Sequence, residues 1–392
     1  ADVLLWGLRK ARTQPYKKGD IVLVRFDLGA LRLAEILQAK ILSMGMNPML
    51  RLSGTPAMDL NFYGLANDMQ LVFQPPGSRE LLSRLNGSIF LSAPASLTHL
   101  RNTDPRKIAK AALAYKPLRD ILNKRDERGD FGWTLCTLPT AELARQARLS
   151  MADYTRQIIR ACYLNKADPA REWEAIYRDA RSLKRWLNSL KVKRYVIQSA
   201  SIDLVITPGE RRKWIGISGH NIPSFELFFS PDWRGTEGCY YANLPSFRSG
   251  NYISGVQLEF KKGTAVTLRA KEGEAFARKQ LAMDSGAGRI AKRLTASISF
   301  VESAAATSGF TATNAGQALT GHRVAELPLS FRLAHGAPPE RHTARRRRRG
   351  VRRGQPAPLG TRPLRQAAPP GGAPRGPGRG VSHPGVHPCS PR

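Results

Sequence analysis

The stretch from residue 21 to residue 52 constrains the fold of this chain most, because it predicts a strand, a helix and a second strand in succession. Ile21–Phe26 is an apolar, β-rich run typical of a buried strand, and apolar residues recur at helical spacing over Leu31–Met44. Gly45 is a suitable helix end, and Met49–Leu52 predicts the second strand. Two strands joined through a helix pair in parallel. The amino-terminal part is therefore expected to hold a parallel sheet.

The same alternation of strands and helices continues to about residue 190. We therefore predict an α/β domain with a mainly parallel sheet over residues 1–192. Further strands are expected at 70–73, 88–92 and 133–138, and further helices at 3–13, 59–66, 79–85, 105–128, 140–147, 151–164 and 169–190.

Composition changes near residue 193, where short apolar segments alternate with Gly and Pro turns. This pattern predicts antiparallel strands, and Pro208-Gly209 predicts one hairpin. We expect a β-rich α+β domain over residues 193–292, incomplete for reasons given below. Its strands are expected at 194–198, 202–207, 213–218, 226–229, 240–243, 252–260 and 265–269, followed by a helix at 272–283.

A third composition begins at residue 293. Residues 293–392 contain no Lys, Asp, Tyr, Trp or Met, and hold 13 of the chain's 27 prolines. Their 16 arginines and three acids give a net +13 of the chain's +32, and five arginines run together at Arg345–Arg349. Few large apolar side chains and high like charge cannot offset chain entropy, so we predict a disordered tail.

Two hypotheses account for this tail. Arg, Ala, Pro and Gly have GC-rich codons, so the tail has the composition of a GC-rich gene translated out of frame after codon 292. The alternative is a genuine basic tail, which would make the chain a nucleic-acid-binding protein acting through its Arg-rich carboxy terminus. The remaining net charge of +19 is spread over the first 292 residues. We therefore expect contact with nucleic acid only through the Arg-rich tail.

The sequence predicts a cytoplasmic protein that does not enter a membrane. It has no run of about 18 apolar residues, and its first residues lack the small-residue cleavage site of a signal peptide. The four cysteines form no Cys-x-x-Cys pair, which is typical of free thiols in a reducing compartment.

Glu226 is the candidate functional residue, in a segment rich in aromatic residues, Gly and Pro. If Ser224–Phe228 is a strand, Glu226 shares a face with Ser224 and Phe228, and its two neighbours face the other way. A carboxylate in apolar surroundings needs a partner, and a metal cation is a good one. The residues alone leave open a plainer interpretation, an edge strand with Glu226 in water.

Several separated segments resemble the aminopeptidase T, aminopeptidase S and PepS family of metallo-aminopeptidases. They occur in the family's order, and the resemblance covers residues 1 to about 292. The segments are Asn221-Ile222-Pro223, Phe225-Glu226-Leu227-Phe228, the run from Ser230 to Gly238, Asn243-Leu244-Pro245-Ser246, the run from Gly255 to Phe260, and Asp284-Ser285-Gly286-Ala287-Gly288-Arg289-Ile290.

The resemblance implies a metal-dependent enzyme that hydrolyses amino-terminal residues from peptides and forms a homodimer. In the family two divalent metal ions, of Zn, Co, Mn or Mg, activate a water. Their ligands are two Glu, two His and one Asp, a set of hard oxygens and imidazoles. The Glu of the Asn-x-Pro segment is the first ligand, and that role carries over to Glu226.

This sequence departs from the family pattern after Ile290. The second ligand should be a Glu where Lys292 stands, and an ammonium group does not ligate a metal. The tail has five histidines but no Asp, so the expected His-x-Asp is missing. We therefore expect a truncated or inactive copy of the enzyme. An α/β binding module without catalysis would also fit the amino-terminal half.

Other acids and histidines in the first 292 residues are weaker candidates. Asp203 and Glu237 lie in the second domain, where a structural role is the more common one for such acids. His220 is close to Glu226 in sequence, and we expect it to lie in a turn or beside the ligands. His99 precedes the motifs.

Overall fold

The structure is a computed structural model, and it describes most of the chain up to Ala282. The described residues are 1–199, 201–242, 244–248, 250–282 and 288–289, together with the strand segments 300–301 and 330–333.

A five-stranded parallel sheet forms the amino-terminal part, as predicted. Its strands lie in the order β2-β1-β3-β4-β8, and every neighbouring pair is parallel. The last strand, β8, comes from the second half of the sequence, at the start of the Asn-x-Pro segment. The strands are β1 (Ile21–Phe26), β2 (Asn47–Leu52), β3 (Gly87–Ser92), β4 (Gly132–Thr137) and β8 (Asn221–Ile222).

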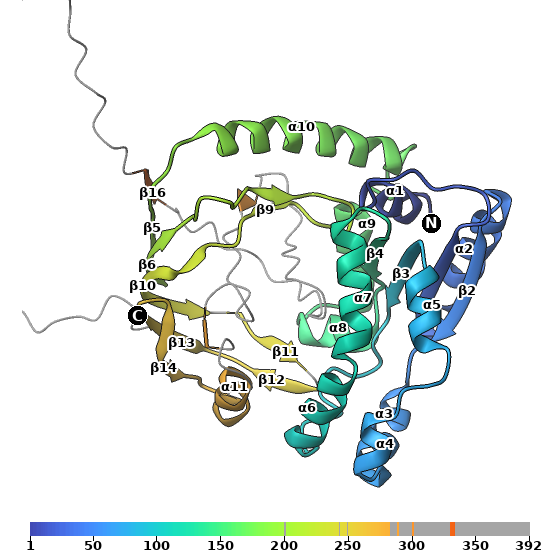
Figure 1. Ribbon diagram of the computed structural model, residues 1–392, viewed down its shortest axis with the longest axis horizontal. Coiled ribbons are helices and arrows are strands. Elements are labelled where there is room, and N and C mark those ends of the chain that lie inside the picture. Colours follow the sequence, from blue (N-terminus) through green and yellow to red (C-terminus); the bar gives the residue numbers. More distant parts are fainter. Residues whose placement is uncertain are drawn as a thin grey trace, which may run out of the picture. The chain divides into compact units, whose positions relative to one another are not determined.

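Helices cover both faces of this sheet, and its central strands β1, β3 and β4 carry most of its buried residues, whereas the edge strand β2 is largely exposed. On one face Val22 and Val24 contribute to a large core with side chains from α1, α2, α8, α9 and α10. On the other face Leu23 packs with residues of α5 and α7. The helices are α1 (Asp2–Lys10), α2 (Leu31–Ser43), α3 (Pro56–Leu65), α4 (Asp68–Val72), α5 (Ser78–Arg84), α6 (Pro105–Ala114), α7 (Lys116–Glu127), α8 (Ala141–Gln146), α9 (Met151–Ala161) and α10 (Pro169–Ser189), and they are labelled in Figure 1.

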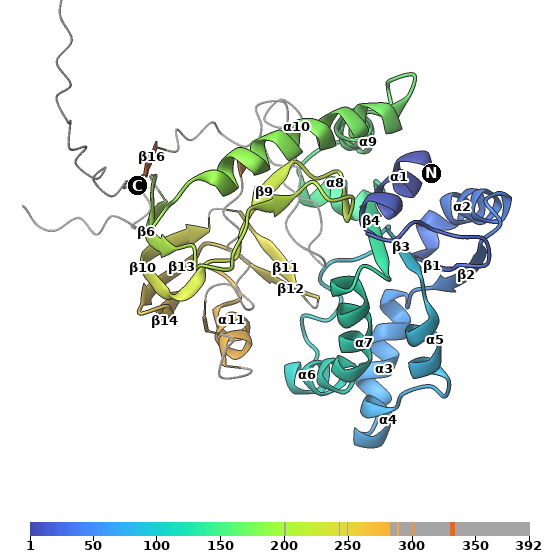
Figure 2. The same cartoon turned by 45° about the horizontal axis from the view of Figure 1, so that its top comes forward.

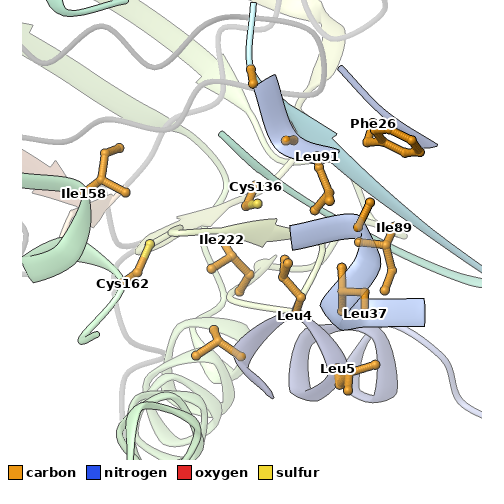
Figure 3. Close-up of a cluster of buried hydrophobic side chains, with 14 of the residues drawn as sticks. Leu4, Leu5, Phe26, Leu37, Ile89, Leu91, Cys136, Ile158, Cys162 and Ile222 are labelled. Atoms are coloured by element: carbon orange, nitrogen blue, oxygen red, sulfur yellow. The ribbon is translucent and has the colours of Figure 1, made fainter. Parts of the chain in front are cut away.

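The large core joins segments that are far apart in sequence. Figure 3 shows Leu4 of α1, Leu37 of α2, Ile89 of β3 and Ile222 of β8 pointing toward one another. Ile222 therefore belongs to the same core as the first helices, and the segment that leads to Glu226 leaves directly from this core.

A second sheet is antiparallel, also as predicted. Its order is β14-β13-β10-β6-β5-β16, and one face packs against α11 (Glu274–Leu281) through Leu258, Phe260 and Phe276. The strands are β5 (Tyr195–Ser199), β6 (Ile202–Thr207), β10 (Asp232–Ala242), β13 (Val256–Lys261), β14 (Thr264–Arg269) and β16 (Ser330–Leu333).

Two small sheets complete the described strands. One is the hairpin of β11 (Ser246–Arg248) and β12 (Asn251–Ile253). The other has the order β15-β9-β7 and consists of β7 (Ile215–Gly216), β9 (Glu226–Phe228) and β15 (Phe300–Val301). The strands β15 and β16 lie within the segment predicted as a tail, and the rest of residues 293–392 lies outside the described residues.

Four predicted elements are wrong. The strand predicted over 252–260 is two strands of different sheets, β12 and β13. Residues 70–73 are not a strand, because Asn67 and Gln70 form a capping box that begins α4. The helix predicted over 105–128 is two helices, and Pro117 stands at the start of the second. Pro208-Gly209 is not a hairpin turn, because β6 pairs with β5 and β10 and the chain after it enters β7 of another sheet.

The cysteines differ in part from the prediction of free thiols. Cys136 and Cys162 are free and buried in the large core. Cys239 of β10 is disulfide-bonded, so the prediction is wrong at this position. Spacing along the sequence does not show which thiols meet in the fold.

Among the described residues, no helix combines the length and apolarity that a membrane crossing requires.

Candidate metal centre

Glu226 is the first residue of β9 and one of the few buried charged side chains, with 9% of its surface exposed. Burial alternates around it. Phe225, Leu227 and Phe229 are buried in apolar clusters, whereas Ser224 is only half-buried. The carboxylate therefore belongs to the face of the segment that does not enter the apolar clusters.

Phe225 fixes one side of the candidate residue. Its ring stacks on Trp173 of α10, with ring centroids 5.3 Å apart, and meets the edge of Tyr163. Trp173 is itself held, because its indole N–H donates to the carbonyl of Cys162 at 3.2 Å. Phe225 thus belongs to the large core of the parallel sheet.

Leu227 fixes the other side, in a different core. It packs in a cluster with Phe229, Tyr195 and Trp214. The three aromatic rings of this cluster contact one another, with centroids between 4.6 and 5.9 Å apart. The two residues on either side of Glu226 are therefore packed in two separate cores, and this packing leaves the backbone of Glu226 little freedom.

Strand β7 supports β9 from one edge. Gly216 pairs with Leu227, and its backbone lies so close to Glu226 that a Cβ at Gly216 would overlap the carbonyl oxygen of Glu226. Gly216 also has φ +130°, a conformation that favours Gly. The sequence needs Gly at this position for both reasons.

Helix α10 in turn holds β7. The ammonium of Lys184 donates to the carbonyl of Gly216 at 2.7 Å. The side-chain amide of Asn188 donates to the carbonyl of Trp214 at 3.1 Å and accepts from its N–H at 2.7 Å. Sequence analysis missed these supporting residues, since Lys184 and Asn188 resemble any polar residues on a helix surface.

The chain reaches Glu226 directly from the parallel sheet. Asn221 and Ile222 pair with Leu135 and Cys136 of β4, and the peptide between Ile222 and Pro223 is cis. Only three residues then separate β8 from Glu226. This short connection places the carboxylate next to the carboxyl end of the last parallel strand, the edge at which open α/β sheets bind ligands.

His220 does not lie beside Glu226 but turns toward β4 and α7. Its ring lies 4.4 Å from that of Trp133, and its Nδ1 is 2.7 Å from the hydroxyl of Ser218. Burial lowers the pKa of His220, and the Asp126 carboxylate opposes this shift. Burial raises the pKa of Asp126, opposed by His220 and by a hydrogen bond with Trp133. This group ties the turn before β8 to α7.

The other candidate residues have structural contacts. Asp203 of β6 lies opposite Cys239 and accepts from the Gln198 amide at 3.5 Å. Glu237 accepts from the backbone N–H of Lys262 at 2.7 Å. His99 is bonded to Asp59 of α3 at 3.1 Å. The contacts of Asp203 and Glu237 lie within the antiparallel sheet, and the contact of His99 joins the loop after β3 to α3.

The described residues offer one candidate metal ligand. Glu226 is a hard oxygen donor held on a rigid backbone, which suits a divalent cation. Among the residues that the structure describes, no three His, Cys, Asp or Glu side chains are grouped so that they could hold a metal. Most of the Asp284–Ile290 motif and Lys292 lie outside them. Arg289 is described, and its guanidinium lies 4.0 Å from the centroid of the Trp233 ring.

The fold is similar to that of a solved structure, wild-type AmpT from Thermus thermophilus. The TM-score is 0.61 at 22% identity, over 74% of this chain and 76% of that one. This likeness concerns the fold alone.

Curated relatives share the sequence pattern. Aminopeptidase T of Thermus thermophilus is 26% identical over 213 residues, 49% of this chain and 50% of the relative. Aminopeptidase AmpS of Bacillus subtilis is 25% identical over 227 residues, 53% and 54% of the two chains. Aminopeptidase PepS of Streptococcus thermophilus is 26% identical over 140 residues, 33% and 34% of the two chains. This chain matches about half the length of the relatives from Thermus thermophilus and Bacillus subtilis, and a third of the one from Streptococcus thermophilus.

The family profile described as thermophilic metalloprotease (M29) matches residues 1–293, three quarters of the chain and all of the segments singled out above except the tail. The chain belongs to the thermophilic metalloprotease (M29) family.

Proposed function

We propose that this chain derives from a metal-dependent aminopeptidase that hydrolyses amino-terminal residues from peptides. The observation that carries the proposal is the buried carboxylate of Glu226, set between two apolar cores inside the segment that resembles the family. Relatives named aminopeptidase T, AmpS and PepS support the same activity.

Glu226 would be a ligand of the divalent metals, two of Zn, Co, Mn or Mg. Bound metals supply Lewis acidity, which polarises a peptide carbonyl and lowers the pKa of water. The contribution of this chain is to hold the Glu226 carboxylate in a fixed position. Because β7 and two cores fix the backbone of Glu226, its carboxylate is preorganised and loses little freedom when it binds a cation.

We further propose that this sequence is an inactive copy. Lys292 stands where the resemblance places a second Glu, and no Asp follows Asp284. A protonated amine in a ligand position repels the cation that a carboxylate would hold. The cytoplasm is the location we propose, on the sequence evidence alone.

The test is to measure metal content and the hydrolysis of leucine p-nitroanilide by the purified full chain with Zn²⁺, Co²⁺, Mn²⁺ or Mg²⁺. We expect less than one metal per chain and no hydrolysis above buffer. The matched protein is the product of the same gene with a one-base correction at codon 292, which should restore a Glu and the missing His and Asp ligands.

The corrected protein should bind metal and release p-nitroaniline, and its Glu226→Gln variant should lose both properties. Stoichiometric metal and strong hydrolysis by the uncorrected chain would show that the tail is genuine. A corrected gene that encodes no His-x-Asp would remove the basis for the frameshift.

We also propose that the protein forms a homodimer through α3 and α4. Neither helix forms a core of its own, since α3 buries no residue and α4 buries only Leu71. The exposed apolar side chains of these two helices and of Phe73, which we call the α3–α4 patch, are Met58, Leu60, Phe62, Leu65, Met69, Val72 and Phe73. Figure 2 shows the two helices at the lower end of the amino-terminal part.

The α3–α4 patch has the size that a dimer needs. Its exposed fractions correspond to about 800 Å², close to the area that one partner buries in a standard interface. Its two acids are already paired, Asp59 with His99 and Asp68 with Lys110. An apolar patch in which each acid has a partner can face its own copy in a symmetric dimer.

A further inference from the structure

A hollow of about 490 Å³ opens beside the end of α10, within the usual range of small-molecule sites. Two connections form its walls. Lys191 and Lys193 belong to the connection from α10 to β5, and Arg212 and Lys213 to the connection from β6 to β7. All four cations have exposed side chains.

The charge of this hollow is one-sided. Glu210 is the only acid that lines it, against four cations. None of the four cations forms an ion pair with any residue that the structure describes, although 15 ion pairs occur elsewhere in that part of the chain, from Lys10–Glu174 to Arg278–Glu274. Like charges gathered around one concavity repel one another unless an anion lies between them.

The base of the hollow is aromatic and rigid. Tyr195, Trp214 and Phe229 line it and are themselves almost fully buried. The indole N–H of Trp214 donates to the Tyr195 hydroxyl at 3.1 Å, and Asn188 holds the Trp214 backbone from α10. The base of the hollow is therefore part of the fold.

The hollow is separate from the candidate metal ligand. Leu227 and Phe229 pack in the aromatic cluster beneath it, whereas Glu226 does not line it. An occupant would therefore contact the structure that holds β7 and β9 without reaching the carboxylate.

We propose that this hollow binds a small oxyanion carrying two or more negative charges, a phosphate ester or a polycarboxylate. The two pairs of cations lie on different connections, so an anion with separated charges can contact both. Arg212 offers a planar fork and the lysines offer point charges, and phosphate and carboxylate oxygens accept from both. Such a ligand would link the end of α10 to the connection that precedes β7. This proposal goes beyond the proposed peptidase function and does not depend on it.

The experiment is a thermal unfolding titration of the full chain, with isothermal calorimetry, using pyrophosphate in one arm and triglutamate in the other. Thermal stability is the chosen readout because an anion held equally by native and unfolded chains leaves the midpoint unchanged. KCl at equal ionic strength separates binding from screening.

The variant Lys191→Glu with Lys213→Glu removes one cation from each wall. The matched control is Lys17→Glu with Lys166→Glu, which makes the same charge change at exposed lysines elsewhere. We expect a saturable rise in midpoint with at least one of the two anions. In the first variant the dissociation constant should increase by about tenfold or more, and in the control it should stay within about twofold.

A response to pyrophosphate alone identifies a phosphate site, and a response to triglutamate alone identifies a carboxylate site. Equal stabilisation by KCl, or equal loss of binding in both double variants, would show only general charge screening and would overturn the proposal. Absence of a midpoint shift with either anion would overturn it as well.

Discussion

The backbones of Gly216 in β7 and Glu226 in the neighbouring strand β9 are so close that a side chain on Gly216 would overlap the carbonyl oxygen of Glu226. Gly216→Ala would add a methyl group against the Glu226 carbonyl and strain a backbone at φ +130°. We expect a loss of at least about 2 kcal/mol in the free energy of unfolding, measured in urea. Gly29→Ala is the control, because a Cβ there meets Ala93 only at a van der Waals distance of 3.4 Å, and it should change the free energy of unfolding by less than about 1 kcal/mol. Equal effects would mean that the two strands are not packed as described.

Lys184 should contribute to the support of β7 through its single hydrogen bond to Gly216. Lys184→Met keeps most of the stem but leaves this carbonyl without its donor, so the free energy of unfolding should fall by about 1–3 kcal/mol. Lys166→Met, at an exposed lysine, should change it by less than about 0.5 kcal/mol in the same assay. A Lys184 variant as stable as wild type would exclude this support.

Phe225 should be the most sensitive neighbour of Glu226. Phe225→Ala would leave a cavity against Trp173, with an expected cost of about 3–5 kcal/mol and a red shift of tryptophan fluorescence. Trp186→Ala removes a larger side chain, but one that is 55% exposed on α10, and should cost far less. If both variants unfold at the same urea concentration, Phe225 is not a core residue.

His220 should make the fold sensitive to acid. Burial lowers its pKa in the native state, so the unfolded chain binds the proton at a higher pH. The stabilisation that the neutral His220 side chain contributes is fully present above the unfolded-state pKa of about 6.5. It is lost as the pH falls from there toward the lower pKa of the native state. His220→Gln should reduce the slope of unfolding free energy against pH below pH 6.5 by up to about 1.4 kcal/mol per pH unit. Asp126→Asn should retain the slope, and a wild-type slope in the His220 variant would contradict this assignment.

The α3–α4 patch should control association. Leu65→Gln with Met69→Gln places amides on its two most exposed positions and should convert a dimer to a monomer in sedimentation velocity. Leu42→Gln with Leu164→Gln makes the same kind of change at exposed leucines on α2 and after α9, and should leave the dimer intact. A monomeric wild-type protein would remove the basis for the proposed interface.

The amino-terminal sheet could be predicted because apolar, β-rich runs mark its strands and apolar residues recur at helical spacing in the helices between them. Ile21–Phe26 is predicted at the bounds that the structure gives to β1. The apolar run at residues 70–73 is too short for its period to separate strand from helix, and capping by Asn67 decided the outcome. Pro208-Gly209 has turn residues, yet local sequence does not reveal which strands pair across a sheet.

Glu226 could be selected from its segment, but its surroundings could not. The hydrogen bonds that hold β7 come from Lys184 and Asn188, 32 and 26 residues away from their partners. Such contacts depend on how α10 lies over the strands, and an exposed lysine or asparagine carries no sequence pattern that indicates it. The orientation of His220 toward Asp126 has the same origin.

The parallel sheet ends with β8, a strand that the chain supplies only after all ten helices of the amino-terminal part and the hairpin of β5 and β6. The two halves of the gene are consequently not exchangeable modules. A fission of the gene between them would remove the border strand from the parallel sheet and leave the β4 backbone open to pairing with foreign chains. Selection on solubility alone would therefore keep the Asn-x-Pro segment joined to the first sheet, even in a lineage that no longer uses the carboxylate beside it.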